Sequence, residues 1–167
     1  MAYYIAQATR KKGIAFRKLP YSRKAGTAYH WTYVIRAIDP KARKAIVADA
    51  KAAVKSGKIR YSNEAATNAK LYDDTKKHKF DCSKLKKKSS TNCINYASVC
   101  CRFAGLKTPR KSSAASMVRT WKDVRGLKII RYRHGKTKLR AGDLLDASQK
   151  PSCHVAIYIG KRGKKKK

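Results

Sequence analysis

The stretch NCINYASVCCRFAG, residues 92–105, has the pattern of a buried helix that begins at a cysteine. Asn92 is a favoured N-cap residue, because its side chain can accept a hydrogen bond from a free backbone N–H of the first turn. Apolar side chains follow at helical spacing, at Tyr96, Val99, Cys100 and Phe103. Gly105 suits the left-handed conformation that ends many helices. We therefore predict a helix over 93–104 with Cys93 in its first turn.

A second long helix is predicted over 40–56, upstream of the first. Asp39 is a good N-cap and Pro40 suits the first helical position, while Gly57 supplies a stop. Apolar residues recur between them at 42, 45, 46, 50, 53 and 54. Two shorter helices are expected over 62–72 and 113–122. The lysine-rich stretch 76–90 is expected to form a loop.

The periodicity changes after Leu127 to that of β-strands. Runs of β-branched and apolar residues predict strands over 128–133, from Leu144 onward, and over 154–159. Helices followed by strands favour an α+β fold, with N-terminal helices packed on a small antiparallel sheet. Residues 1–38 are aromatic, β-branched and basic, and we expect them to form a separate extension of unknown role.

The net charge is the most unusual feature of the composition. Lysine and arginine number 43 against 9 acidic residues in 167, a formal charge of +34. Such a charge predicts salt-sensitive attraction to polyanions: nucleic acid, anionic membranes or anionic wall polymers. The 43% of apolar residues nevertheless suffices for one folded domain. Only the lysine run at 161–167 is expected to be a disordered tail.

Neither a secretory signal nor a membrane-spanning run of apolar residues is recognisable in the sequence. We therefore expect synthesis in a cytoplasm without a signal peptide and no transmembrane segment. The five cysteines are an odd number in such a chain, which favours reduced thiols over a disulfide framework. No C-x2-C or H-x3-H spacing supports a metal site, and we expect neither metal nor cofactor.

Cys93 and His154 form the pair that carries chemistry in this interpretation. A cysteine at a helix N-terminus has its thiol pKa lowered by the helix dipole, and free N–H groups there can hold an oxyanion. A histidine on a facing strand can take the thiol proton. His154 opens the most strand-like segment of the sequence, 61 residues after Cys93.

The amino-acid sequence around these two residues resembles that of NlpC-type and CHAP-like cysteine peptidases that act on peptidoglycan, including bacteriophage endolysins. Three blocks carry the resemblance in the order of the family: Asn92 to Leu106, Arg140 to Leu144 with its G-D-L turn, and Cys153 to Gly160 with its H-V-x-I-Y-x-G strand. The resemblance implies a papain-like hydrolase domain over 39–160 that cuts amide bonds of the bacterial cell wall. Such an enzyme acts at the wall when it is released from the host or carried on a virion.

The resemblance also assigns roles to individual residues. Cys93 is the implied nucleophile, His154 the implied base, and Asp143 a structural residue of the turn. Tyr61 is implied to line the substrate cleft. The family usually orients its histidine with a polar residue on a strand after the H-V strand, which this chain lacks; Asp146 is the expected substitute.

Cys82 is the alternative nucleophile, because Asp81-Cys82-Ser83 matches the family's motif more literally than Asn92-Cys93-Ile94 does. The lysines that follow Cys82 cannot form a buried helix, which favours Cys93. The remaining cysteines are expected to pack in the core. A zinc site built from His78 and the cysteines lacks the required spacing.

Two functions remain open. The first is a cell-wall lytic hydrolase, with peptidoglycan and anionic teichoic polymers as partners. The second is a non-enzymatic basic protein of a virion or nucleoid that binds nucleic acid on a degenerate hydrolase fold, for which tyrosines among lysines are suited. A membrane-active protein is disfavoured, because no long amphipathic helix face is present.

Overall fold

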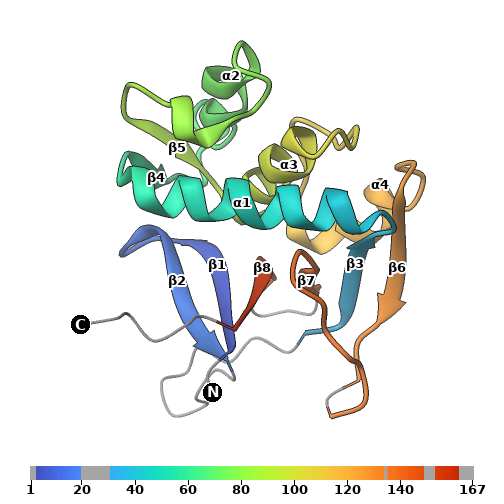
Figure 1. Ribbon diagram of the computed structural model, residues 1–167. Helices are drawn as coiled ribbons and strands as arrows, with labels where there is room; N and C mark the ends of the chain where they lie inside the picture. The colour runs from blue at the N-terminus through green and yellow to red at the C-terminus, as the bar shows by residue number, and fades with distance from the viewer. Residues whose placement is uncertain (1–2, 20–30, 134, 149–152, 162–167) are drawn as a thin grey trace.

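The computed structural model describes residues 3–19, 31–133, 135–148 and 153–161. The main sheet has six strands: β1 Tyr3–Thr9, β2 Gly13–Leu19, β3 Tyr33–Ala37, β6 Leu127–Arg131, β7 Leu144–Ala147 and β8 His154–Lys161. They lie in the order β2-β1-β8-β7-β3-β6, and every neighbouring pair is antiparallel (Figure 1). A small parallel pair joins β4 Ile59–Tyr61 to β5 Ser89–Thr91. The predicted α+β class is therefore confirmed.

The helices pack on one face of this sheet. They are α1 Pro40–Ser56, α2 Lys70–Lys76, α3 Cys93–Phe103 and α4 Met117–Trp121, with single 3₁₀ turns η2 Cys82–Lys84 and η3 Ala114–Ser116. The main hydrophobic cluster lies between the helices and the sheet, and joins Ile46 of α1, Ile94 of α3 and Val155 of β8. A smaller second cluster lies on the other face of the sheet, around Ile5, Val34, Leu145, Ala156 and Tyr158.

The two long helices follow the local sequence signals. The Asp39 side chain accepts a hydrogen bond of 2.9 Å from the Lys41 N–H, and Gly57 ends α1 in the left-handed region at φ 63°. The predictions of helices over 40–56 and 93–104 are confirmed. The helix expected over 62–72 is wrong, because residues 64–69 form turns and α2 starts only at Lys70. The Ser62 hydroxyl bonds the Thr67 hydroxyl at 2.6 Å and caps no helix.

The N-terminal segment belongs to the central sheet. Strand β1 pairs with β8, with Ile5 opposite Tyr158 and Ala6 opposite Ile157, and it pairs with β2 on its other side. Strand β3 likewise lies between β6 and β7. Strand β1 thus occupies the sheet position beside β8. The sequence analysis had found no strand after β8 to fill this position. The predicted tail lies outside the described residues except for Lys161, the last residue of β8.

A buried ion pair fixes the turn that leads into β7. The Arg36 guanidinium donates to both carboxylate oxygens of Asp143 at 2.8 Å, and the Arg140 N–H donates to the same carboxylate. Gly142 precedes it at φ 96°, and a Cβ there would lie 2.7 Å from the backbone of Arg43 in α1. The G-D-L turn is therefore held by charge and by close contact with α1, and Asp143 is a structural residue.

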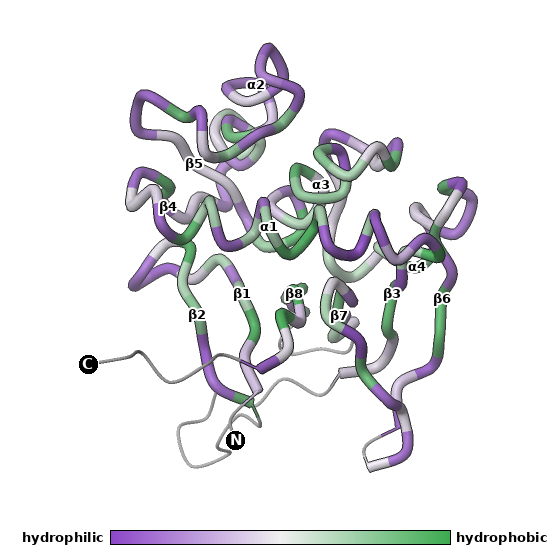
Figure 2. The backbone as a smooth tube through the Cα atoms, in the orientation of Figure 1, coloured by the Kyte–Doolittle hydropathy of each residue, from purple (hydrophilic) through white to green (hydrophobic). Residues whose placement is uncertain are grey.

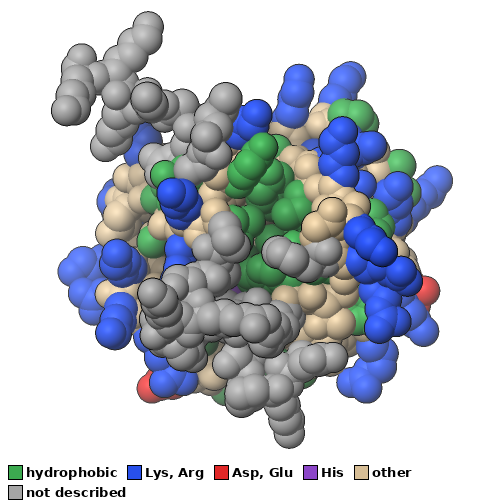
Figure 3. Space-filling model, turned by 90° about the horizontal axis from the view of Figure 1, so that it is seen from below, with side chains coloured by type: hydrophobic (Ala, Val, Ile, Leu, Met, Phe, Trp, Pro, Cys, Tyr) green, Lys and Arg blue, Asp and Glu red, His purple; other side chains and the backbone are tan. Residues whose placement is uncertain are grey.

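Charge and hydrophobicity are distributed unevenly over the surface. The side of the molecule with α2, β4 and β5 is mostly hydrophilic, whereas α3 is largely apolar (Figure 2). Seen from below, lysine and arginine side chains surround a hydrophobic centre and acidic side chains are few (Figure 3). Among the described residues, no helix combines the length and the apolar character needed to cross a membrane.

Candidate active site

The start of α3 is held in place by hydrogen bonds from two sides. The Asn92 side chain accepts from the Asn95 N–H at 2.9 Å, as an N-cap should. The Asn68 carbonyl in turn accepts from the Asn92 N–H at 3.1 Å and from the Asn95 side-chain amide at 3.0 Å. The loop before α2 therefore fixes the turn that carries Cys93.

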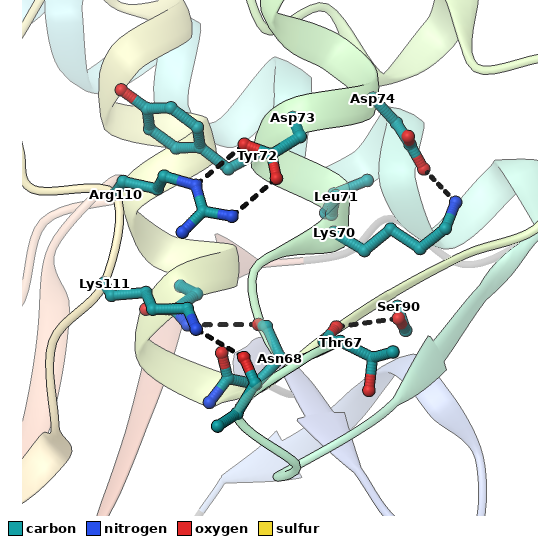
Figure 4. Close-up of polar contacts among 12 residues, drawn as sticks. Thr67, Asn68, Lys70, Leu71, Tyr72, Asp73, Asp74, Ser90, Arg110 and Lys111 are labelled. Atoms are coloured by element: carbon teal, nitrogen blue, oxygen red, sulfur yellow. Dashed lines mark hydrogen bonds and ion pairs between the residues drawn. The ribbon is translucent and has the colours of Figure 1, made fainter.

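The same loop connects Tyr61 to the nucleophile helix. Tyr61 ends β4 opposite Thr91, the last residue of β5 and the second residue before Cys93. The side chains around Asn68 include Lys111, which donates to the carbonyl of Ala65 (Figure 4). The half-buried Tyr61 thus lies on the strand beside β5, and β5 leads directly to the start of α3.

The Cys93 thiol lies against the backbone at the start of β8. The backbone N–H groups of Val155, Ile94 and Cys93 itself lie close enough to the sulfur to lower its pKa. Burial nevertheless raises the pKa of the thiol to about 11, since only 8% of the residue is exposed, and the Asp146 charge adds to the rise. The sequence predicted a lowered pKa from the helix dipole; in the structure, the loss of solvation outweighs the three N–H groups.

His154, the residue before Val155, is hydrogen-bonded to a side chain that the sequence had not singled out. Its Nε2 lies 2.8 Å from Oε1 of Gln7 on β1. An amide oxygen can only accept, so Nε2 carries the proton of the neutral ring. Nδ1 then holds the lone pair that a general base requires. Gln7 thus makes with the ring the kind of hydrogen bond that we expected of Asp146.

The surroundings of His154 keep its ring neutral. Burial lowers the pKa of the imidazole to about 4, and the nearby charge of Arg17 lowers it further. The Trp31 ring lies beside it, with ring centroids 6.2 Å apart. Near pH 7 the resting site therefore contains a thiol and a neutral imidazole. General-base activation uses these two protonation forms. The alternation along β8, however, directs the His154 ring to the face of the sheet away from α3, whereas Cys93 belongs to the cluster on the helix side.

Asp146 lies on a different face of the sheet from His154. It is opposite Val155 in the β7–β8 register, whereas His154 is opposite Ala147. Because side chains alternate along a strand, Asp146 points with Leu144 toward the helices and His154 with Ala156 toward the second cluster. Within the part of the chain that the structure describes, neither carboxylate oxygen of Asp146 has a hydrogen-bond partner, and burial raises its pKa to about 7. Asp146 is thus a buried carboxyl near Cys93.

Replacing Asp146 with asparagine is expected to stabilise the protein at neutral pH. The pKa of the Asp146 carboxyl is about 7 in the folded protein and has an ordinary value of 3.8. The folded protein therefore loses stability as the pH rises from 3.8 to 7, and this carboxyl causes no further loss above pH 7. At about 1.4 kcal/mol per pKa unit, the advantage of the variant should grow from near zero at pH 4 to on the order of 4 kcal/mol above pH 7. Urea unfolding at several pH values measures it. Asp123→Asn, an exposed change, is the control, and a pH-independent difference for Asp146→Asn would contradict the assignment.

The other four cysteines lie in surroundings that suit a role in packing. Cys82, the alternative nucleophile, is fully buried; its N–H donates to Oδ1 of Asp49 at 2.8 Å and its sulfur lies 3.5 Å from Oδ2. Burial raises the pKa of the Cys82 thiol well above its usual range. Cys100 and Cys101 are fully buried in α3, and the Cys153 sulfur contacts the Ser148 carbonyl. Across the described ranges, no three His, Cys, Asp or Glu side chains gather as a metal site would require.

Gln7 is the residue that sequence reasoning missed. The signal was present as a single polar residue between Ala6 and Ala8 in an otherwise apolar strand. Only 2% of Gln7 is exposed, and a buried amide requires a partner. The identity of that partner could not be derived, because Gln7 and His154 are 147 residues apart in sequence.

Comparison with known proteins gives one match. The family profile described as an endolysin-like domain matches residues 19–165. No curated protein and no solved structure matches the chain. The matched region contains Cys93, Asp146 and His154 but begins at the last residue of β2, so that Gln7 lies outside it.

Proposed function

The chain belongs to the endolysin-like domain family, and from this premise we propose that it is an NlpC-type cysteine hydrolase that cuts amide bonds in peptidoglycan. The observation that carries the proposal is that Cys93 is the first residue of a capped, buried helix and that the start of β8, where His154 precedes Val155, lies near its sulfur. The hydrogen bond from His154 to Gln7 supports it, because this bond leaves Nδ1 as the basic nitrogen.

In the proposed mechanism, Nδ1 of His154 takes the thiol proton while the Cys93 sulfur forms a bond to an amide carbonyl carbon of a wall peptide. His154 is the first residue of β8 and its ring lies on the face away from α3, so the proposed transfer requires a path around the end of the strand. The N–H groups of Cys93 and Ile94 stabilise the oxyanion, since free N–H groups at a helix start point toward it.

The second half of the reaction reverses the proton transfer. The imidazolium gives its proton to the leaving nitrogen as the C–N bond breaks, and a thioester of Cys93 remains. Water, deprotonated by His154, then attacks the thioester and releases the carboxylate and the thiol. Tyr61, on the strand beside the one that enters α3, is proposed to line the cleft that holds the wall peptide.

The papain-like relationship is part of this proposal. It is supported by a helix that starts at the nucleophile, by an antiparallel sheet that carries the base, and by a polar residue on the strand next to the base. The proposed site of action is the bacterial cell wall, which the enzyme reaches after release or as part of a virion.

Analysis of the digestion products tests the proposed bond class. Purified peptidoglycan incubated with the protein should release new amino groups in proportion to the fall in turbidity, without new reducing sugar ends. His154→Ala should abolish the release, because the thiol with pKa about 11 then has no base. New reducing ends without new amino groups would show a glycosidase and overturn the proposal.

A further inference from the structure

Five lysines surround a hollow of about 400 Å³ between α2 and the chain that follows it. They are Lys70, Lys77, Lys84, Lys86 and Lys87. The catalytic candidates Cys93, His154 and Gln7 do not line this hollow. The hollow is therefore a second feature of the surface, built from a different part of the chain.

The charge in this hollow is poorly balanced within the protein. Asp74 is the one carboxylate that lines it, and its Oδ2 already accepts from Lys70 at 2.7 Å (Figure 4). The same oxygen also accepts from the Ser89 hydroxyl at 2.7 Å. Three of the nine acidic residues of the chain are buried, so only six remain near the surface. Like charges held this close repel one another and favour a bound polyanion.

The lysines are presented by a fixed loop. Buried Cys82 is tied to Asp49 of α1, and the Asp81 side chain accepts from the Ser83 N–H at 3.0 Å to cap the 3₁₀ turn. Leu85 is buried, and its carbonyl accepts from Lys58 at 3.1 Å. The loop thus has internal anchors on both sides of Lys84, so that binding an anion there requires little ordering of the backbone.

We infer that this lysine hollow binds the phosphodiester backbone of an anionic wall polymer of the poly(glycerol phosphate) kind. Lysine ammonium groups bind phosphate as point charges and require no fixed orientation of a polymer repeat. The inference rests on the proposed function for the choice of a wall polymer. The binding chemistry itself needs only the lysines.

Nucleic acid is the competing polyanion, and the hollow lacks what a single strand would need. Stacking of bases requires exposed aromatic rings beside the basic groove. The nearest large rings, Tyr72 and Phe80, pack on each other with centroids 4.7 Å apart, and Arg102 lies over both. Tyr72 is buried, and neither ring lines the hollow.

The test compares two triple variants of equal charge in an inactive Cys93→Ala background. Lys77→Gln/Lys84→Gln/Lys86→Gln removes three charges from the hollow, and Lys44→Gln/Lys51→Gln/Lys55→Gln removes three exposed charges from α1. Binding of a defined poly(glycerol phosphate) oligomer is measured by calorimetry at several salt concentrations. We expect the hollow variant to bind about ten- to a hundredfold more weakly and to show a shallower salt dependence, and the α1 variant to change less than about threefold.

Equal weakening in both variants would overturn the inference, since it would show a general effect of net charge. Tighter binding of a single-stranded DNA oligonucleotide of equal charge, lost in the hollow variant, would overturn it in favour of nucleic acid. Lys77→Arg/Lys84→Arg/Lys86→Arg should keep the affinity; its loss would also count against a charge-based site. Hydrolysis of a short phosphate-free wall peptide by the hollow variant with Cys93 intact should equal wild type, so that failure of binding and failure of catalysis are distinguishable.

Discussion

Cys93→Ala is expected to abolish the release of amino groups from peptidoglycan, by more than about a thousandfold. Without the sulfur no thioester can form, and the remaining N–H groups at the start of α3 have no covalent intermediate to stabilise. The side chain is small and the helix cap at Asn92 is retained, so the folded structure should persist. Turbidity loss and amino-group release, with the thermal unfolding midpoint measured in parallel, check this expectation.

Alanine substitutions of two other cysteines, Cys153 and Cys82, serve as matched controls for Cys93→Ala. Cys153→Ala removes a half-buried thiol next to His154, and Cys82→Ala removes the sulfur beside Asp49. Both should keep lysis per folded molecule within about threefold of wild type, although Cys82→Ala should unfold at a lower temperature because its site is fully buried. Lysis that survives Cys93→Ala, or that is lost only in Cys82→Ala, would refute the assignment of the nucleophile.

Gln7→Ala is expected to lower kcat by about ten- to a hundredfold with little change in KM. Alanine removes the acceptor at 2.8 Å from Nε2, so the ring is no longer held in the tautomer with a basic Nδ1. Only 2% of Gln7 is exposed, so a bound wall peptide should not contact it and KM should be maintained. Steady-state kinetics on a soluble wall peptide measure both constants.

Gln7→Glu separates positioning from a merely structural role. The acidic limb of kcat/KM in the wild type should fall near pH 4, where His154 becomes protonated. A carboxylate beside Nε2 favours the imidazolium, so the pKa of His154 and the acidic limb should shift to higher pH, with activity retained above it. An unchanged pH profile in Gln7→Glu together with an unchanged kcat in Gln7→Ala would show that Gln7 has no part in catalysis.

The parts of the fold that the sequence predicted are those determined locally. α1 and α3 begin at good caps and end at or near a glycine, and their apolar spacing covers a full helix face. Strand β8 was recognisable from its β-branched run. The segment before α2 was misread, because Ser62 has the character of a cap residue but bonds Thr67 across a turn.

The site was predictable in its residues but not in its connections. Cys93 and His154 stand out by their place at the start of a helix and of a strand. The partner of His154 could not be found, because it depends on β1 pairing with β8 and on the register of that pair. Asp146 seemed suitable by proximity in sequence, yet its place opposite Val155 directs it to the other face of the sheet.

The electrostatics of the site depend on burial, which no local pattern gives. A cysteine at a helix start was expected to be acidic, and the buried sulfur instead has a pKa of about 11. The imidazole shifts in the opposite direction for the same reason, to a pKa of about 4. The two shifts together favour a neutral thiol and a neutral imidazole over an ion pair.

The pairing of β1 with β8 also determines when during synthesis the enzyme can become active. The hydrogen bond between Gln7 and His154 joins two strands of the sheet through residues that are 147 positions apart in the sequence. A nascent chain that has passed Cys93 but not residue 154 has its nucleophile and lacks both its base and the partner strand for β1. Such long-range pairing is among the slower steps in folding. On the proposed mechanism, a fragment without β8 has no hydrolytic activity, and catalysis begins only when β8 has paired with β1.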